Sequence, residues 1–419
     1  MTKPETTELS TGMPARTGQA EIRCFTGLRG CAAVLVMAYH FALNMPDSSV
    51  VRQQFLLNGY LWVDLFFILS GFVMAYSQAD NFRSGYKVRT HIAFLTGRIA
   101  RIYPLYALVI LESAVLVMWR ADGLDIRGAV STLFLNLALV QAWGFAPSLE
   151  GAAWSISTEW CAYLIFPALL AAALASARWV ATITFVFAAA AIVYLATSAG
   201  PFTFPDQNRN GPLDIYSWVT AAPLLRCVAE FTLGLLAYRI AVPVMATKPI
   251  WVRAFTWIVT LSLLLTLSMK GADIWVVSLF VLLLIGLSAQ VGWISKLLGM
   301  RLPYCLGQWS YSIYLLHDKF SHPAMLLETY LRGKTPAPAI IAALAMCVGV
   351  VMLGALSFFF IERPLRRIAG RYLRKVPALQ LWDPFGSKLQ SRALECDGVG
   401  GANQAGLSDS RASLIEGVR

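Results

Sequence analysis

Charged residues are scarce in this sequence. They make up 14% of its 419 residues, whereas hydrophobic residues make up 58%, and ordinary globular domains carry roughly 25% charged residues. This scarcity excludes a soluble globular protein and a largely disordered chain. The seven cysteines form no Cys-x-x-Cys pair, so we expect neither a disulfide framework nor a zinc site.

The sequence is rich in long apolar runs. A spanning helix needs about 20 mostly apolar residues, and ten runs qualify: 24–45, 59–78, 96–119, 154–175, 178–198, 222–241, 251–269, 273–291, 304–321 and 338–361. An eleventh run, 129–143, is shorter. The sequence therefore predicts an all-α polytopic membrane protein with about ten transmembrane helices plus one short re-entrant or interfacial segment.

The net charge of +11 is read as a topology signal, and no nucleic-acid partner is expected. If the N-terminus lies in the cytoplasm, the inner loops hold twenty Lys and Arg residues and the outer loops hold eight. Positive charge concentrates on the cytoplasmic side of membrane proteins. We expect a cytoplasmic N-terminal tail over 1–22, a transmembrane domain over 23–365, and a basic segment with a flexible cytoplasmic tail over 366–419.

Ionisable side chains within apolar runs are costly, so each is a candidate functional residue. They are Arg29, His40, Asp64, Glu112, Glu159, Arg226, Glu230, His317 and Glu362. A helix rises about 1.5 Å per residue, which places His40, Asp64, Glu159 and His317 at similar depths toward the outer face. A histidine beside a carboxylate is the usual apparatus of general base catalysis. The alternative is a buried polar cluster that serves stability.

Arginines mark the opposite, cytoplasmic side. Arg29 precedes His40 by eleven residues, about three helical turns, so both lie on one helix face. Residues 98–106 read RIARIYPLY, and Arg98 and Arg101 there face the same way. Arginine suits phosphate geometry, so this pattern fits a long anionic cofactor such as coenzyme A. The alternative is ordinary anchoring of basic residues at the interface.

Six segments, in this order, resemble signatures of the membrane acyltransferase-3 family. They are LRGCAAVLVMAYHF with its Arg-x10-His spacing, GYLWVDLFFILSGFVM at 59–74, RIARIYPLY, WSISTEWCAYLIFP at 154–167, GQWSYSIYLLH at 307–317 and FIERP at 360–364. The family pattern often continues Glu-Glu after the Ser-x-Ser stretch, whereas here Trp160 follows Glu159. Members of this family transfer acyl groups from coenzyme A thioesters to sugars and other hydroxyl acceptors.

The resemblance implies roles for particular residues. His40 would be the catalytic base, and Asp64 or Glu159 would orient its ring. Acyl-CoA, most often acetyl-CoA, would be the co-substrate, with no metal. Its phosphates would be held on the cytoplasmic side by Arg29, Arg98 and Arg101, with Tyr103. The remaining polar candidates are Ser70, His317, Glu362 and Arg363.

The resemblance also implies an acceptor and a location. The expected enzyme is an O-acyltransferase of the bacterial inner membrane, with both termini cytoplasmic. The acceptor would be a carbohydrate hydroxyl at the outer side, on a surface polysaccharide or its lipid-linked precursor, with glycan-assembly machinery as a further partner. Direct transfer and an acyl-histidine intermediate stay open. The alternatives are acylation of a small-molecule glycoside or antibiotic, a secondary transporter, and a membrane scaffold or receptor.

Overall fold

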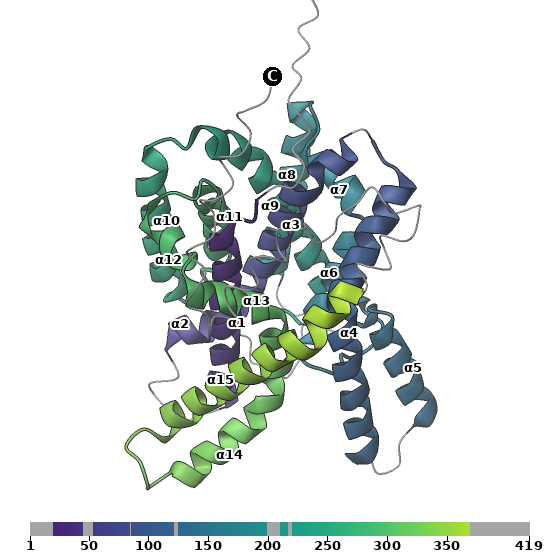
Figure 1. Ribbon diagram of the computed structural model, residues 1–419, viewed down its shortest axis with the longest axis vertical. Coiled ribbons are helices and arrows are strands. Elements are labelled where there is room, and N and C mark those ends of the chain that lie inside the picture. Colours follow the sequence, from purple (N-terminus) through teal and green to yellow (C-terminus); the bar gives the residue numbers. More distant parts are fainter. Residues whose placement is uncertain are drawn as a thin grey trace, which may run out of the picture.

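The computed structural model describes residues 20–44, 53–83, 85–120, 125–198, 210–216 and 220–368, and within these ranges the chain forms helices without any strand (Figure 1). The helices are α1 (Arg23–Asn44), α2 (Gln54–Leu57), α3 (Trp62–Phe82), α4 (Val88–Arg120), α5 (Ile126–Leu137), α6 (Ala153–Leu164), α7 (Phe166–Ala173), α8 (Arg178–Thr197), α9 (Ala222–Thr247), α10 (Trp251–Leu267), α11 (Asp273–Ser288), α12 (Gly292–Leu298), α13 (Arg301–Leu316), α14 (Ser321–Leu331) and α15 (Pro338–Ser357). Short helical turns are η1 (Asn58–Leu61), η2 (Gln141–Trp143), η3 (His317–Phe320) and the π-turn η4 (Phe358–Glu362). The predicted tails, 1–22 and 366–419, lie almost wholly outside the described residues.

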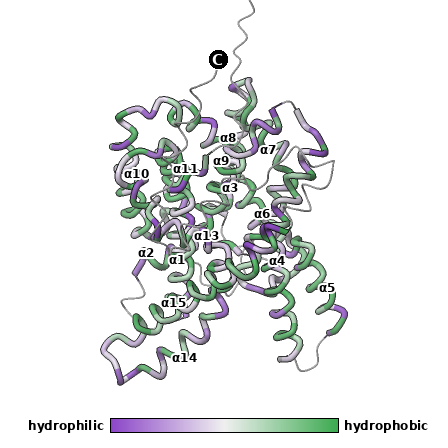
Figure 2. The backbone as a smooth tube through the Cα atoms, viewed as in Figure 1, coloured by the Kyte–Doolittle hydropathy of each residue, from purple (hydrophilic) through white to green (hydrophobic). Residues whose placement is uncertain are grey.

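Among the described residues, six helical stretches are long and apolar enough to cross a membrane, or up to eight if each of two bent pairs counts as one span. Figure 2 shows hydrophobic residues along most of these helices. The protein is therefore a multi-pass membrane protein, but the predicted count of about ten is not confirmed. The helices α10 and α13 have 17 and 16 residues and rise only about 25 Å, less than a hydrocarbon core of about 30 Å.

The two bent pairs have local causes in the sequence. The helices α6 and α7 meet at an angle of 66°, and Pro167 stands at the start of α7, where its missing N–H cannot continue the hydrogen bonds of α6. The helices α11 and α12 meet at 93°. Between them Gln290 and Gly292 adopt left-handed backbone angles, φ 55° and 88°, which end one helix and redirect the chain.

The short apolar run at 129–143 ends in a turn. Its helical part, α5, has 12 residues, about 18 Å of rise, and cannot cross a membrane alone. The Asn136 side chain fixes the turn that follows: its amide donates to the carbonyls of Thr132 and Pro147 at 2.9 Å each, and its oxygen accepts the N–H of Leu149. This turn carries the chain toward the start of α6.

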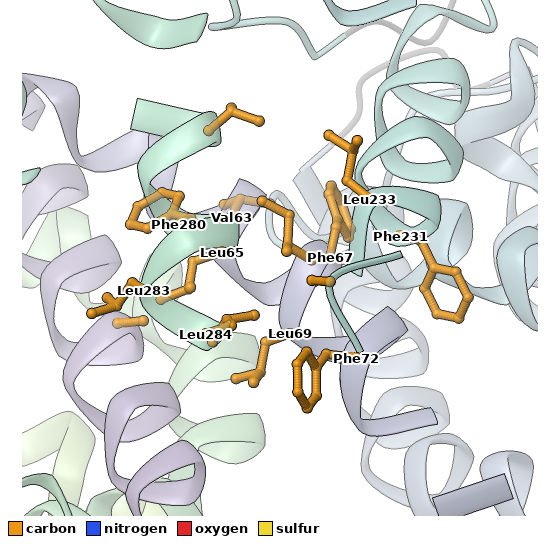
Figure 3. Close-up of a cluster of buried hydrophobic side chains, with 14 of the residues drawn as sticks. Val63, Leu65, Phe67, Leu69, Phe72, Phe231, Leu233, Phe280, Leu283 and Leu284 are labelled. Carbon is orange, nitrogen blue, oxygen red and sulfur yellow. The ribbon is translucent and has the colours of Figure 1, made fainter. Parts of the chain in front are cut away.

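The core of the bundle lies around α3, which packs between α9 and α11. Apolar side chains from the three helices, mostly phenylalanine and leucine, meet there (Figure 3): Val63, Leu65, Phe67, Leu69, Phe72, Phe231, Leu233, Phe280, Leu283 and Leu284. Two glycines let α3 and α9 approach closely. A Cβ at Gly71 would lie 2.0 Å from the Phe231 carbonyl oxygen, and one at Gly234 would lie 2.0 Å from that of Ile68.

The helices α1 and α13 make a second close crossing. A Cβ at Gly30 would lie 2.4 Å from the backbone nitrogen of Gly307, and a Cβ at Gly307 would lie 1.8 Å from the Thr26 carbonyl oxygen. Real Cβ atoms do not approach backbone this closely. Glycine at both positions is therefore what permits the crossing, and the crossing sets the positions of the residues farther along both helices.

We predict that Gly307→Ala forces α1 and α13 apart. Overpacking of this kind costs about 1–3 kcal/mol, so the midpoint of thermal unfolding in detergent should fall. Gly349→Ala is the matched control, because a Cβ there meets only ordinary contacts with the Phe320 ring, the nearest at 3.4 Å. The control should be neutral or stabilising, since alanine is the better helix former. Equal melting points for the two variants would contradict the close crossing.

Candidate active site

Two histidines from distant parts of the chain are in contact. His40 lies one turn before the end of α1, and His317 begins η3 directly after α13. Nε2 of His317 lies 3.1 Å from Nδ1 of His40, and the ring centroids are 4.7 Å apart. His317 is 1% exposed, whereas His40 is partly accessible. The depth estimate from sequence placed both near the outer face, and the structure brings them together.

Asp64 has a different partner from the one expected. It is fully buried and accepts two hydrogen bonds from the guanidinium of Arg226 on α9, one of them from Nε at 2.9 Å. Glu230, one turn along α9, lies 3.5 Å from the same Nε. Both carboxylate oxygens of Asp64 are therefore bonded to Arg226. The His40 ring contacts His317 rather than Asp64.

Glu159 is also held by another group. It accepts a hydrogen bond of 2.6 Å from the hydroxyl of Tyr163, one turn later on α6, and that hydroxyl lies 3.1 Å from Ser70 Oγ on α3. The charge of Arg98 interacts with both Tyr163 and Glu159. Within the described residues no hydrogen bond joins Glu159 to a histidine. Its contacts place it with the arginines rather than with the histidine pair.

The hydroxyls that precede Glu159 tie α6 to its neighbours. Ser155 Oγ lies 2.8 Å from the hydroxyl of Tyr314, which is on the last turn of α13. Ser157 donates to the Leu139 carbonyl at 2.9 Å and accepts the N–H of Ala142. The start of α6 is thereby fixed both to the turn after α5 and to α13, the helix that ends directly before His317.

Four arginines gather at the other end of α1. Arg29 lies on α1, Arg98 and Arg101 on α4, and Arg366 on the helical extension of α15, and their charges act on one another. Arg29 donates from Nη2 to the Gly307 carbonyl at 3.0 Å. Arg366 pairs with Glu362, which also accepts the Ser312 hydroxyl.

Three of these arginines keep an unused donor. The Nε atoms of Arg29, Arg98 and Arg366 are buried and have no hydrogen-bond partner among the residues that the structure describes. A buried N–H without an acceptor is costly, and several guanidinium groups in one place repel one another. Glu21, Glu159 and Glu362 are the carboxylates that act on these arginines, and three carboxylates neutralise only part of the charge of four guanidinium groups. An anion with several oxygens would satisfy both the donors and the charge, and phosphate groups have that chemistry.

Two further predicted site residues, Tyr103 and Arg363, contact aromatic rings. The Tyr103 ring packs on Tyr106, 6.3 Å between centroids, and the Arg363 guanidinium lies 5.9 Å over the Phe359 ring. Sequence reasoning did not select Arg366, although it stands one turn after Glu362, a spacing typical of a helical ion pair. It also missed Tyr163 and Tyr314, since tyrosines in apolar helices look like ordinary core residues.

Lys319 anchors the turn that carries His317. Its ammonium bonds Glu112 on α4, Glu150 in the loop before α6 at 2.9 Å, and Ser113 at 3.1 Å. Burial raises the pKa of the Glu150 carboxyl, and the hydrogen bond from Lys319 opposes that rise. Three separate elements are thus joined around one cation next to the histidine pair.

The amino-acid sequence is similar to those of known acyltransferases. The sequence model of a family described as "Acyltransferase domain" matches residues 22–359. The acyltransferase MdmB of Streptomyces mycarofaciens is 29% identical over 398 residues, which cover 86% of this chain and 95% of that protein. The peptidoglycan O-acetyltransferase OatA of Listeria monocytogenes is 24% identical over 368 residues, which cover 81% of this chain and 55% of that protein.

A third relative, protein 2 in the picA locus of Rhizobium radiobacter, is 33% identical over 192 residues, which cover 41% of this chain and 92% of that protein. No solved structure matches the chain.

We predict that Asp64 acts through stability. Asp64→Asn leaves the charge of Arg226 buried without its main partner, which costs about 3–5 kcal/mol and should lower the thermal unfolding midpoint in detergent. Adding Arg226→Met removes the stranded charge and should recover much of that loss. A folded Asp64→Asn protein with an unchanged midpoint but much lower turnover would instead give Asp64 a role in orienting the base.

Proposed function

We propose a function from the premise that this chain belongs to the acyltransferase-3 family, whose domain spans residues 22–359. The protein is an acyltransferase. Its proposed reaction moves an acyl group, most often acetyl, from acyl-CoA on the cytoplasmic side to a carbohydrate hydroxyl on the outer side of the membrane. The observation that carries this proposal is the group of four arginines with three unpartnered Nε donors.

The arginine group suits the phosphates of coenzyme A. Guanidinium groups bind phosphate oxygens in pairs of parallel hydrogen bonds, and Arg29, Arg98 and Arg366 each offer a free Nε–H. Arg101 adds charge at the same place. The head of the donor would thus be held near the cytoplasmic face, where acyl-CoA is made, with the N-terminal end of α1 on that side.

The base lies at the far end of the same helix. His40 follows Arg29 by eleven residues, about 16 Å along the axis of α1. A flexible arm running from the phosphates along α1 would bring a thioester toward His40. The acceptor would then approach from the outer side, where His40 is partly accessible. This division supports transfer across the membrane without movement of the whole donor.

Direct transfer requires only one base. His40 removes the proton of the acceptor hydroxyl while the hydroxyl oxygen attacks the carbonyl carbon of the thioester. A C–O bond forms, the C–S bond breaks, and the leaving thiolate takes the proton from the His40 imidazolium. The products are the acyl ester and free coenzyme A, and His40 returns to its starting state.

The acceptor is proposed as a bacterial surface polysaccharide or its lipid-linked precursor. The name of the relative OatA, a peptidoglycan O-acetyltransferase, supports a surface glycan as the class of acceptor. The apolar helices support a position in the bilayer, where a lipid-linked sugar would be within reach. Both termini are proposed to be cytoplasmic, in the inner membrane.

The first test is mass spectrometry of surface glycans and glycolipids from a strain that lacks the gene. The strain is complemented with wild type or with His40→Ala at equal protein level. We expect an acyl mass increment only with wild type, and the modified species would identify both acyl group and acceptor. Matching profiles in a strain that makes the relevant glycans would contradict the proposal.

The second test concerns the donor site. Arg98→Lys keeps the charge but loses the forked geometry, so the KM for acyl-CoA should rise roughly ten- to a hundred-fold, while the KM for the acceptor stays constant. Arg253→Ala, which removes an exposed arginine on α10, is the control and should change neither constant. An unchanged KM for acyl-CoA in the Arg98 variant would remove the arginines from the donor site.

A further inference from the structure

We propose that His317 is a positioning residue that, together with the Val36 carbonyl, fixes the tautomer of His40, so that Nε2 of His40 carries the lone pair that accepts a proton. This inference rests on the proposed function, because it names the atom that would act as base there. It starts from two backbone carbonyl oxygens, which can only accept hydrogen bonds.

The first carbonyl fixes the proton of His317. Tyr314 is on the last turn of α13, where helix carbonyls have no partner within the helix. Its oxygen lies 2.5 Å from Nδ1 of His317, so Nδ1 carries the hydrogen. A neutral imidazole has only one N–H. Nε2 of His317 is therefore an acceptor.

The second carbonyl fixes the proton of His40. The Val36 oxygen, one turn earlier on α1, lies 3.0 Å from Nδ1 of His40. The same Nδ1 lies 3.1 Å from Nε2 of His317. Both neighbours are acceptors, so Nδ1 of His40 must carry the hydrogen, which the two acceptors share. The lone pair of His40 is then on Nε2, the nitrogen that neither contact uses.

The opposite arrangement requires a buried cation. If His317 donated from Nε2 while Nδ1 donated to Tyr314, the ring would carry two protons and a positive charge. His317 is 1% exposed, and in the described part of the chain no ion pair joins it to a carboxylate. A charge in that position is strongly disfavoured. Two neutral rings satisfy every contact without one.

The arrangement differs from a catalytic triad in one respect. In a triad a carboxylate accepts the Nδ1 proton of the base, whereas here a neutral imidazole does so. When Nε2 of His40 takes a proton, Nδ1 keeps donating to His317, and the ring stays in place. A neutral acceptor stabilises the resulting cation less than a carboxylate would, so the proton passes on readily to the leaving thiolate.

The surrounding contacts hold His317 in this orientation. Tyr314, which supplies the carbonyl, is tied through its hydroxyl to Ser155 on α6 at 2.8 Å and packs against the Phe66 ring at 5.6 Å. Lys319, two residues after His317, bonds to α4 and to the loop before α6. The acceptor nitrogen is therefore presented to His40 by rigid elements.

The test compares two substitutions at the same position. His317→Leu removes the acceptor and keeps an apolar side chain, whereas His317→Gln restores an oxygen that accepts the Nδ1 proton of His40. We expect kcat to fall roughly a hundred- to ten-thousand-fold in the leucine variant, with the KM for acyl-CoA and acceptor nearly unchanged. The glutamine variant should recover at least tenfold of that loss. Equal kcat for the two variants would overturn the proposal.

A second measurement does not depend on activity. Nitrogen NMR of protein with labelled histidines distinguishes a protonated ring nitrogen from one with a lone pair. The chain has four histidines, and the signals lost in His40→Gln identify those of His40. We expect a protonated Nδ1 and an unprotonated Nε2 in wild type. In His317→Leu the Val36 carbonyl is the remaining acceptor for the Nδ1 hydrogen, so we expect the same tautomer to lose part of its population to the Nε2–H form.

The two measurements separate the two proposals. A proton on Nε2 of wild-type His40 would overturn the role of His317, whatever the enzyme transfers. The expected spectrum in a protein that transfers no acyl group would overturn the proposed function and leave the hydrogen-bond arrangement standing. Thermal unfolding of both variants provides the control for folding, and a kcat loss that follows the melting point in both would assign His317 to stability alone.

Discussion

The close crossing of α1 and α13 is the constraint on which the rest of the site depends. Gly30 and Gly307 allow the two backbones to approach to a distance that no side chain permits. One consequence lies at the crossing itself, where Arg29 reaches the Gly307 carbonyl. The other lies near the far ends of both helices, where His40 meets His317. One packing contact therefore positions both the histidine proposed as base and one of the four arginines.

Ionisable groups in this bundle fall into two sets, which differ in how many of their hydrogen-bond donors and acceptors have a partner. Asp64 accepts two hydrogen bonds from Arg226, and that pair joins α3 to α9 within the core. The arginines near Glu362 instead keep buried donors that no acceptor in the described part of the chain reaches. A satisfied pair serves the fold, because it has no capacity left for a ligand. The unsatisfied donors are where a ligand is expected.

The ionisable residues and the regions that carry them could be predicted from the sequence alone, but several of their partners could not. His40 and His317 were selected because charge in an apolar run is costly, and helical rise placed them at similar depth. Asp64 pairs with Arg226, a partner that the sequence did not indicate. Where a residue has several potential partners, the packing and rotation of the helices decide which one it contacts. Neither can be read from the spacing of residues along the chain. Tyr314 shows the same limit, since its carbonyl matters only because α13 ends there.

Composition and motif order by themselves determined that this protein is an all-helical membrane acyltransferase, because apolar runs and their order are properties of the chain. The number of spans was not determined in this way. Run length cannot reveal a helix broken at Pro167 or redirected at Gln290. Only the tertiary structure decided which polar groups are satisfied, because hydrogen bonds between α1, α3, α9 and α13 depend on distances across the bundle. The contact of His317 with His40 was decided there, and it orients the proposed base.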